Sequence, residues 1–146
     1  MDDNLQKLRE KTGAGVMDCK KALEEAKGDF EKAVKVIEKK GIANASKKSD
    51  RKTSAGLLEA YIHAGKVGVL LDIRCETDFV ARTENFKKLA HEIAMHIAAM
   101  NPENIDTLLK ENYIRDPNTT IEELIKREII RLGENIKIER FCRYET

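Results

Sequence analysis

Two histidines come nearest to the spacing of a metal site. The segment from His91 to His96 reads HEIAMH, one residue longer than the HExxH pattern of zinc proteases. On a helix, a step of five residues turns the second imidazole by about 140° from the first, so the two rings cannot easily share one metal. The cysteines Cys19, Cys75 and Cys142 form no Cys-x-x-Cys pair, which argues against structural zinc. We therefore expect no metal site.

A glycine-rich segment has only a superficial likeness to a phosphate-binding loop. Gly13 and Gly15 are followed by Lys20 and Lys21, but the spacing to a Gly-Lys-Ser/Thr is missing and no strand precedes the glycines. No serine or cysteine lies in a recognisable nucleophile setting with a paired base. We therefore expect no catalytic residue, no cofactor and no enzyme activity.

The composition describes an ordinary globular protein of one or two small domains. Of 146 residues, 41% are hydrophobic and 36% are charged, and the net charge of +1 provides no field to attract nucleic acid or an anionic membrane. The acidic start has no apolar run typical of a signal peptide, and no stretch approaches the length of a membrane span. Three scattered cysteines suggest a reducing compartment, and we expect a cytoplasmic protein.

The elements that would position a site begin with three short helices. Apolar residues recur at helical spacing in residues 4–11, 16–27 and 30–40, and glycines at positions 13, 15, 28 and 41 separate or end these stretches. Together they predict a three-helix bundle over residues 1–40, near the lower size limit for independent folding. Residues 41–54 are rich in lysine and small residues, and we interpret them as a basic linker that is helical at most in part.

Residues 55–146 open with a predicted β-hairpin. Leu58, Ala60 and Ile62 alternate with polar or aromatic neighbours, and residues 64–66 form a tight connection. From Val67 to Cys75 the apolar residues occupy every odd position, which predicts that this side of the second strand faces a core.

Helices and a last strand follow the hairpin. A broad apolar stripe over residues 84–100 predicts a long helix that Asn101 and Pro102 end, and a short helix is expected near residues 107–112. Thr120 is expected to cap another helix that continues to Gly133, and residues 136–144 read as a third strand. This order predicts an α+β core, a three-stranded antiparallel sheet with helices on one face.

The segment between the second strand and the long helix interrupts all these patterns. Here Asp78 and Phe79 lie side by side in the sequence CETDFVAR of residues 75–82. One interpretation is structural, with Asp78 capping a helical turn and Phe79 closing the end of the core. The other is an exposed aromatic wedge on a rigid mount, which is a natural hot spot for insertion into a partner. The residues alone leave both open and favour the buried phenylalanine.

A second set of candidates surrounds the first glycine turn. Val16 and Met17 at a helix start are more often core than interface, but adjacent helical residues point about 100° apart, so we expect one of them outside. An exposed methionine with Arg9 and Lys20 nearby would make an adaptable contact patch.

Three segments together resemble the elongation factor Ts family. Residues 8–23 read LREKTGAGVMDCKKAL, residues 75–82 read CETDFVAR and residues 130–138 read IRLGENIKI. Each is similar to a signature of that family, and the three occur in the family's order across nearly the whole chain.

The resemblance implies a function and a set of site residues. It implies a UBA-like amino-terminal bundle joined to an α+β core of the dimerisation type, and a partner, elongation factor Tu, from which the factor releases GDP. By matching position, Thr77, Asp78, Phe79 and Val80 would form a wedge that enters the GTPase near its magnesium site. Arg9, Val16, Met17 and Lys20 would grip another face of the same GTPase domain.

The chain departs from the longer members of that family. The region from Pro102 to Thr120 is short and only one copy of the core is present, so homodimerisation is one way to restore the missing surface. Cys142 on the last strand would then lie at the interface, although a buried free thiol is the prediction that the sequence favours.

Two other functions remain to be distinguished from nucleotide exchange. The bundle could serve as a UBA-like interaction module without exchange activity, which predicts binding without GDP release. The lysines of residues 39–52 could bind RNA, which predicts strongly salt-dependent binding. Neither alternative accounts for the three matched segments.

Overall fold

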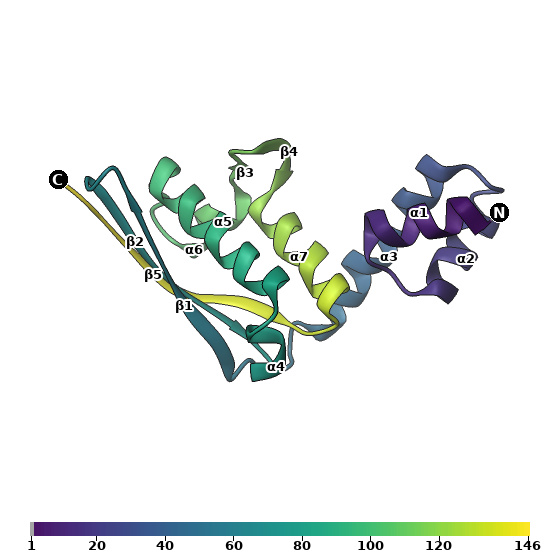
Figure 1. Ribbon diagram of the computed structural model, residues 1–146, viewed down its shortest axis with the longest axis horizontal. Coiled ribbons are helices and arrows are strands. Elements are labelled where there is room, and N and C mark those ends of the chain that lie inside the picture. Colours follow the sequence, from purple (N-terminus) through teal and green to yellow (C-terminus); the bar gives the residue numbers. More distant parts are fainter. Residues whose placement is uncertain (1) are drawn as a thin grey trace.

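The computed structural model describes residues 2–146 and has an elongated shape with two ends (Figure 1). Helices α1 (Asp2–Thr12), α2 (Val16–Glu25) and the first half of α3 (Phe30–Lys48) form a bundle at one end. A three-stranded sheet with its helices forms the other end. The predicted α+β architecture is confirmed.

The core of the bundle consists of small apolar side chains and a few larger ones. Its buried residues come from all three helices: Leu8, Cys19, Ala22, Leu23, Ala26, Ala33, Val34 and Ile37. The turn between α1 and α2 depends on Gly13, which has a φ of +71° and whose missing Cβ would lie about 3.0 Å from the side chain of Arg131. That contact joins the bundle to a helix of the core.

Helix α3 is longer than predicted and links the two ends. The expectation that it would end before Gly41 is wrong, because α3 continues to Lys48, whereas residues 41–54 are helical only in part, as expected. Gly41 is buried, and a Cβ there would overlap Ile130 of the core, so glycine at this position permits close packing and does not end the helix. Ala45, one turn further, belongs to the core cluster of the second end.

The sheet has the order β1-β2-β5, with both neighbouring pairs antiparallel. Its strands are β1 (Ala55–His63), β2 (Val67–Cys75) and β5 (Ile136–Glu145). Ala64 and Gly65 both have positive φ values, as the tightest hairpin turns require. Val69, Leu71, Ile73 and Cys75 are buried, so the prediction that the odd positions of β2 face the core is confirmed.

Helices cover only one face of the sheet. Helix α5 (Glu84–Met100) lies against β1 and β2, while α7 (Ile121–Leu132) packs on α3, α5 and α6 (Ile105–Lys110) (Figure 1). Asn101 adopts a left-handed conformation at the end of α5, and Thr120 caps α7 in a reciprocal arrangement with Glu123, as predicted for these two helix ends. The short α4 (Asp78–Ala81) connects β2 to α5 at one end of the sheet.

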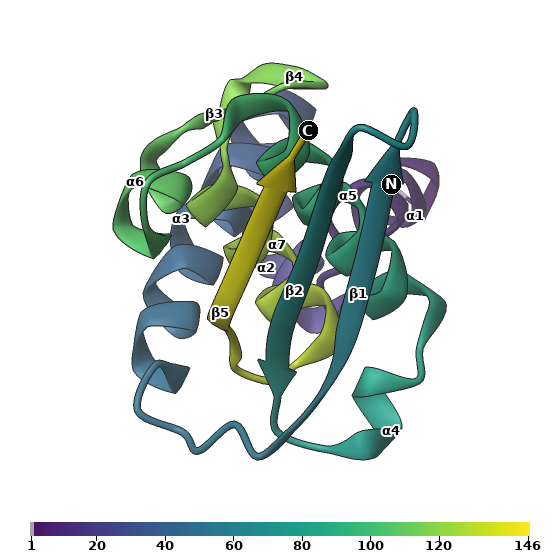
Figure 2. The ribbon, with the colours of Figure 1, turned by 90° about the vertical axis from the view of Figure 1, so that its left-hand side faces the viewer.

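The opposite face of the sheet is not covered by helices (Figure 2), and its exposed side chains are partly apolar. Leu58 and Ile62 of β1, which the alternation singled out as the apolar side, point away from the helices and are 62% and 67% exposed. Leu70 and Tyr144 extend this apolar surface across β2 and β5. Further along the same face, Asp72 accepts hydrogen bonds from Arg74 Nε at 2.6 Å and Arg140 Nε at 3.1 Å.

A small hairpin that the sequence did not predict precedes α7. It consists of β3 (Asn112–Tyr113) and β4 (Asp116–Thr120). The fully buried His96 of α5 holds it, because its Nδ1 accepts the backbone N–H of Ile114 at 3.3 Å. The ring proton then resides on Nε2, which faces Glu111 Oε1 at 3.4 Å. Within residues 2–146, no helix is long and apolar enough to cross a membrane.

The buried His96 predicts a pH-dependent stability. Burial lowers the pKa of His96 below 6.5, an effect that Glu111 only partly offsets, so the unfolded chain binds a proton at a higher pH than the folded one. The free energy of unfolding should therefore fall as the pH drops below 6.5, by at most about 1.4 kcal/mol per pH unit.

The comparison of the parent with His96→Asn isolates this contribution, since asparagine can still accept the Ile114 N–H. Urea unfolding at pH 7.5 and pH 5.0 should show that the parent's stability advantage over the variant shrinks at the lower pH. Burial raises the pKa of Glu128, which acts in the opposite direction in both proteins and cancels in the difference. An unchanged or larger advantage at pH 5.0 would contradict the assignment.

Candidate functional site

The segment that interrupts the sequence pattern, Thr77–Val80, is here called the wedge segment and forms most of α4. Thr77 is the N-cap, since its Oγ1 accepts the backbone N–H of Val80 at 3.3 Å. The structural interpretation of Asp78 as the cap is therefore wrong, and Asp78 instead occupies the first turn, where a carboxylate is favourable.

Phe79 projects into solvent with 82% of its surface exposed. The buried phenylalanine that the residues alone favoured is therefore wrong, whereas exposure agrees with what the resemblance implies. The next two residues, Val80 and Ala81, are buried in the core cluster. A four-residue helix is thus anchored on one side and presents an exposed aromatic ring on the other.

Glu134, in the connection between α7 and β5, holds the start of the wedge segment. Thr77 donates its backbone N–H to Glu134 Oε1 at 3.0 Å and its hydroxyl to Glu134 Oε2 at 2.7 Å. Both carboxylate oxygens therefore bind one residue that lies 57 positions away in the chain.

Cys75 forms a further hydrogen bond with Thr77. Its thiol donates to the carbonyl oxygen of Thr77 at 3.2 Å. Burial, together with the nearby Glu134 carboxylate, raises the pKa of Cys75 to about 11, so the thiol stays protonated at neutral pH. Cys75 therefore acts as a hydrogen-bond donor and not as a nucleophile.

Asn135 joins the wedge segment's surroundings to the end of α3. It is only 2% exposed, and its Nδ2 donates to the carbonyl oxygens of Ser49 and Arg51 at 3.3 and 2.9 Å. Its backbone N–H donates to Glu76 Oε1 at 3.1 Å. Residues 49–51, 75–77 and 133–136 are therefore fixed to one another.

The four predicted grip residues lie together on the bundle surface. Arg9, Val16, Met17 and Lys20 are all exposed, and the expectation that only one of Val16 and Met17 would point outward is wrong, since they are 44% and 62% exposed. Val16, Met17 and Lys20 line an open groove of about 700 Å³ whose floor includes Leu23, and Arg9 lines a neighbouring depression with Val16.

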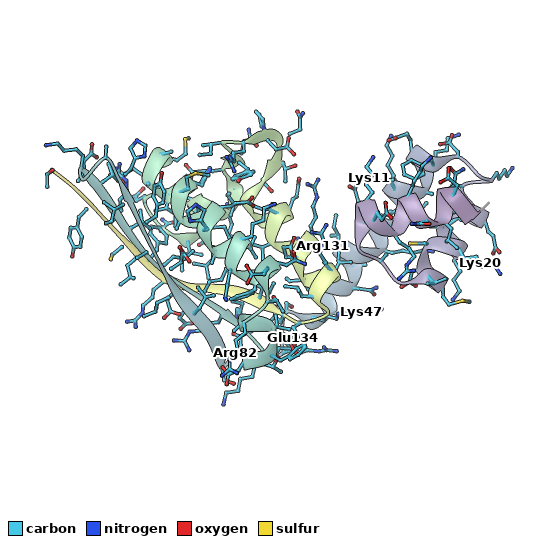
Figure 3. All side chains as sticks on the ribbon, in the orientation of Figure 1. Lys11, Lys20, Lys47, Arg82, Arg131 and Glu134 are labelled. Atoms are coloured by element: carbon cyan, nitrogen blue, oxygen red, sulfur yellow. The ribbon has the colours of Figure 1, made fainter. Side chains whose placement is uncertain are left out.

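The structure places the wedge segment and the grip residues on different ends of the molecule. In Figure 3, Arg82 and Glu134 lie at the lower end of the core, Lys20 on the lower side of the bundle, and Lys47 at the junction between them. The two sites are not parts of one pocket. A ligand that contacts both must be as large as a protein domain.

Two further features of the site concern possible metal ligands and the thiol of Cys142. Within the described residues, no group of three or more His, Cys, Asp or Glu side chains could hold a metal ion. Cys142 lies on the open face of the sheet and is exposed, so the buried thiol favoured by the sequence is wrong. The remaining features, an exposed ring and an exposed groove, suit binding.

Comparison with known proteins identifies the family. The family model described as Elongation factor TS matches residues 76–146. A protein named elongation factor Ts from Fervidobacterium nodosum is 41% identical over an alignment that covers 97% of this chain and 95% of that protein. One from a Thermotoga species is 42% identical and covers 98% and 94% of the two chains. The chain belongs to the elongation factor Ts family. It is therefore a translation elongation factor, a protein of protein biosynthesis.

The elongation factor Ts relatives differ in length. The alignment with the Fervidobacterium protein spans 187 positions, more than the 146 residues of this chain, so that relative contains residues without a counterpart here. A relative from a Nostoc species is 50% identical over 141 residues, yet this chain spans only 44% of its length.

Glu134 and Asn135 belong to the Gly-Glu-Asn-Ile segment that resembles an elongation factor Ts signature, but the resemblance implied no role for either residue. Their partners lie at least 57 residues away, and no periodicity connects such positions. One feature of the sequence could have pointed to them: two polar residues lie between Gly133, which ends a helix, and an apolar strand. A buried polar group at such a point needs partners from elsewhere in the fold.

The network predicts that Asn135→Asp destabilises the fold. The substitution preserves volume but replaces the Nδ2 donor by an oxygen that faces two carbonyl oxygens, so the free energy of unfolding should fall by about 1–3 kcal/mol. Urea unfolding at pH 7.5 measures the change. Asn44→Asp, on the exposed surface of α3, is the matched control and should stay within about 0.5 kcal/mol of the parent. Equal effects of the two substitutions would contradict the role of Asn135.

Proposed function

We propose that this chain is the guanine nucleotide exchange factor of elongation factor Tu. It binds the GDP-bound GTPase, disturbs the magnesium and nucleotide site, and promotes release of GDP so that GTP can bind. The observation that carries the proposal is the 82% exposed Phe79 on a turn that Glu134 and Cys75 hold from two sides.

The wedge segment suits insertion into a partner. An aromatic ring contributes a large contact area and has little conformational freedom to lose, and such residues dominate binding energy at protein interfaces. Because hydrogen bonds already hold Thr77 in the free chain, little conformational entropy of the wedge segment is lost on binding. Asp78 beside the ring adds a carboxylate that would compete for the partner's cationic groups and magnesium.

The grip residues supply a second contact on the same GTPase domain. Met17 next to an apolar groove adapts its shape to a partner surface, and Arg9 and Lys20 provide charges at the rim. With two contacts on separate ends of one chain, binding energy gained at the bundle would favour the displacement of partner groups at the wedge.

Exchange requires no covalent step. Binding of the factor and binding of GDP with magnesium weaken each other by the same factor, as linked equilibria demand. The factor stabilises the nucleotide-free GTPase, and incoming GTP then weakens its hold. The proposal includes action in the cytoplasm, without direct contact to nucleic acid or membrane and without a cofactor.

Phe79→Ala tests the wedge. Loss of the ring should slow the release of a fluorescent GDP from elongation factor Tu by about 10- to 100-fold, because truncation of a hot-spot residue removes roughly 2 kcal/mol or more of interaction. The unfolding midpoint should not change, since the ring makes little contact within the fold.

Met100→Ala is the control, because Met100 is 47% exposed on a different surface, the end of α5. It should release GDP at the parent rate. If Phe79→Ala is as fast as the parent, the wedge assignment is wrong. If the parent binds the GTPase but never accelerates release, the chain is instead a UBA-like interaction module.

We also propose that the open sheet face pairs with a second copy of the chain. Leu58, Ile62, Leu70 and Tyr144 expose large apolar surfaces on this face, and Cys142 lies among them opposite Leu70. A contiguous apolar surface of this kind on one face of a sheet is typical of an interface. The partner that matches it in shape and chemistry is the same surface related by a two-fold axis.

Ile62→Lys tests the pairing. A lysine placed opposite its own copy introduces a desolvated charge, so sedimentation velocity should show a dimer for the parent and a monomer for the variant. Ile114→Lys, on the β3–β4 hairpin, is the control and should remain dimeric. A monomeric parent at micromolar concentration would overturn the pairing and leave the exchange proposal untouched.

A further inference from the structure

We propose that Glu134 is a positioning residue for exchange, which sets the orientation of Phe79 through Thr77 without touching the partner itself. This inference rests on the proposed exchange function and deepens it. Glu134 lies neither in the wedge segment nor among the grip residues, and it comes from the connection that leads into β5, the strand paired with β2.

The contact geometry carries the proposal. The two carboxylate oxygens of Glu134 bind two groups of the same residue, the N–H of Thr77 at 3.0 Å and its hydroxyl at 2.7 Å. Paired bonds to one residue fix its direction as well as its distance, which one bond cannot do. Thr77 immediately precedes the turn that carries Phe79, so its orientation is passed on within two residues.

Thr77 depends on this carboxylate for its role as cap. Its hydroxyl donates to Glu134 and at the same time accepts the N–H of Val80 at 3.3 Å. When the hydroxyl hydrogen points to Glu134, a lone pair is left for Val80. Glu134 therefore selects the hydroxyl orientation in which the cap works.

A turn of this size needs such support from outside. Helix α4 has four residues and closes only about one turn, too short to be stable by its own hydrogen bonds. Val80 and Ala81 anchor its inner side, and the Cys75 thiol holds the carbonyl oxygen of Thr77, but neither contact binds the N–H or the hydroxyl of Thr77. The Glu134 bonds act on its N-cap residue, Thr77, at the other end of the turn.

The geometry distinguishes this role from an electrostatic one. If Glu134 acted by its charge on the partner's cations, aspartate would preserve the function and glutamine would remove it. If it acts by geometry, the order is reversed. Glutamine can still accept the Thr77 N–H and donate to the Thr77 hydroxyl oxygen, while aspartate is one methylene too short to reach both groups.

The test measures the release of fluorescent GDP from elongation factor Tu with Glu134→Gln, Glu134→Asp and Glu134→Ala in the full chain. We expect the maximal rate to fall by about 10-fold or more in the alanine and aspartate variants, because small displacements of a group that acts at a reaction centre are costly. Glu134→Gln should stay within about 3-fold of the parent. The factor concentration at half-maximal rate should change by less than about 2-fold, because the grip is intact.

A double substitution separates positioning from direct contact. Combined with Phe79→Leu, which keeps part of the wedge, Glu134→Ala should slow release by clearly less than the product of the two single effects, since both act through one ring. Multiplicative effects, or a glutamine variant as slow as the alanine variant, would overturn the proposal. A rate loss that follows only the fraction unfolded, measured in the same buffer, would do so as well.

Amide hydrogen exchange keeps this inference distinct from the proposed function. In Glu134→Ala the amides of Thr77 and Val80 should exchange at least about 10-fold faster than in the parent, with those of β1 unchanged. If the parent does not accelerate GDP release from elongation factor Tu, the proposed exchange function is wrong, regardless of the amide exchange rates. If the parent is active and the two amides are as protected as before, the positioning role falls alone.

Discussion

The hydrogen bonds of residues 134 and 135 are the interaction on which the arrangement of the site depends. Two adjacent side chains between α7 and β5 hold the start of α4 and the segment that follows α3. An ion pair between Arg51 and Glu76 at 3.7 Å joins two of the same segments. A glutamate and an asparagine do this with directional bonds, where apolar packing would have fixed the distance but left rotation free.

The same end of α7 also governs where the bundle lies. Ile130 packs into the space left by Gly41 of α3, and Arg131 lies against Gly13 in the first turn of the bundle. A bundle of this size is only marginally stable alone. Since α3 continues through both ends and Ala45 enters the core, a continuous helix joins the bundle to the core, and the bundle gains stability from it.

The periodic patterns of the sequence predicted the elements whose side chains face one core. The alternation over Val67–Cys75 and the stripe over Glu84–Met100 were recognisable because each faces a single core. Gly41 was misread because a glycine in a helix is usually a terminator, and only the distant Ile130 explains it. The outward direction of Leu58 and the exposure of Phe79 and Cys142 oppose the rule that apolar side chains are buried, and such exceptions concentrate where function overrides stability. For Phe79 the family resemblance supplied what the residues could not.

The two exposed apolar features differ in a way that suits different partners. Phe79 is a single ring on a braced turn, whereas Ile62, Leu70 and their neighbours form a broad surface on a sheet. Between them on the open face lies Asp72, whose pKa is lowered by the hydrogen bond from Arg74 and further by Arg140. This charged cluster is expensive to desolvate, so it limits how far an apolar contact can extend toward α4. A second copy seated on the apolar part would stop short of the wedge, and each chain of the pair would keep its own Phe79 free for a GTPase.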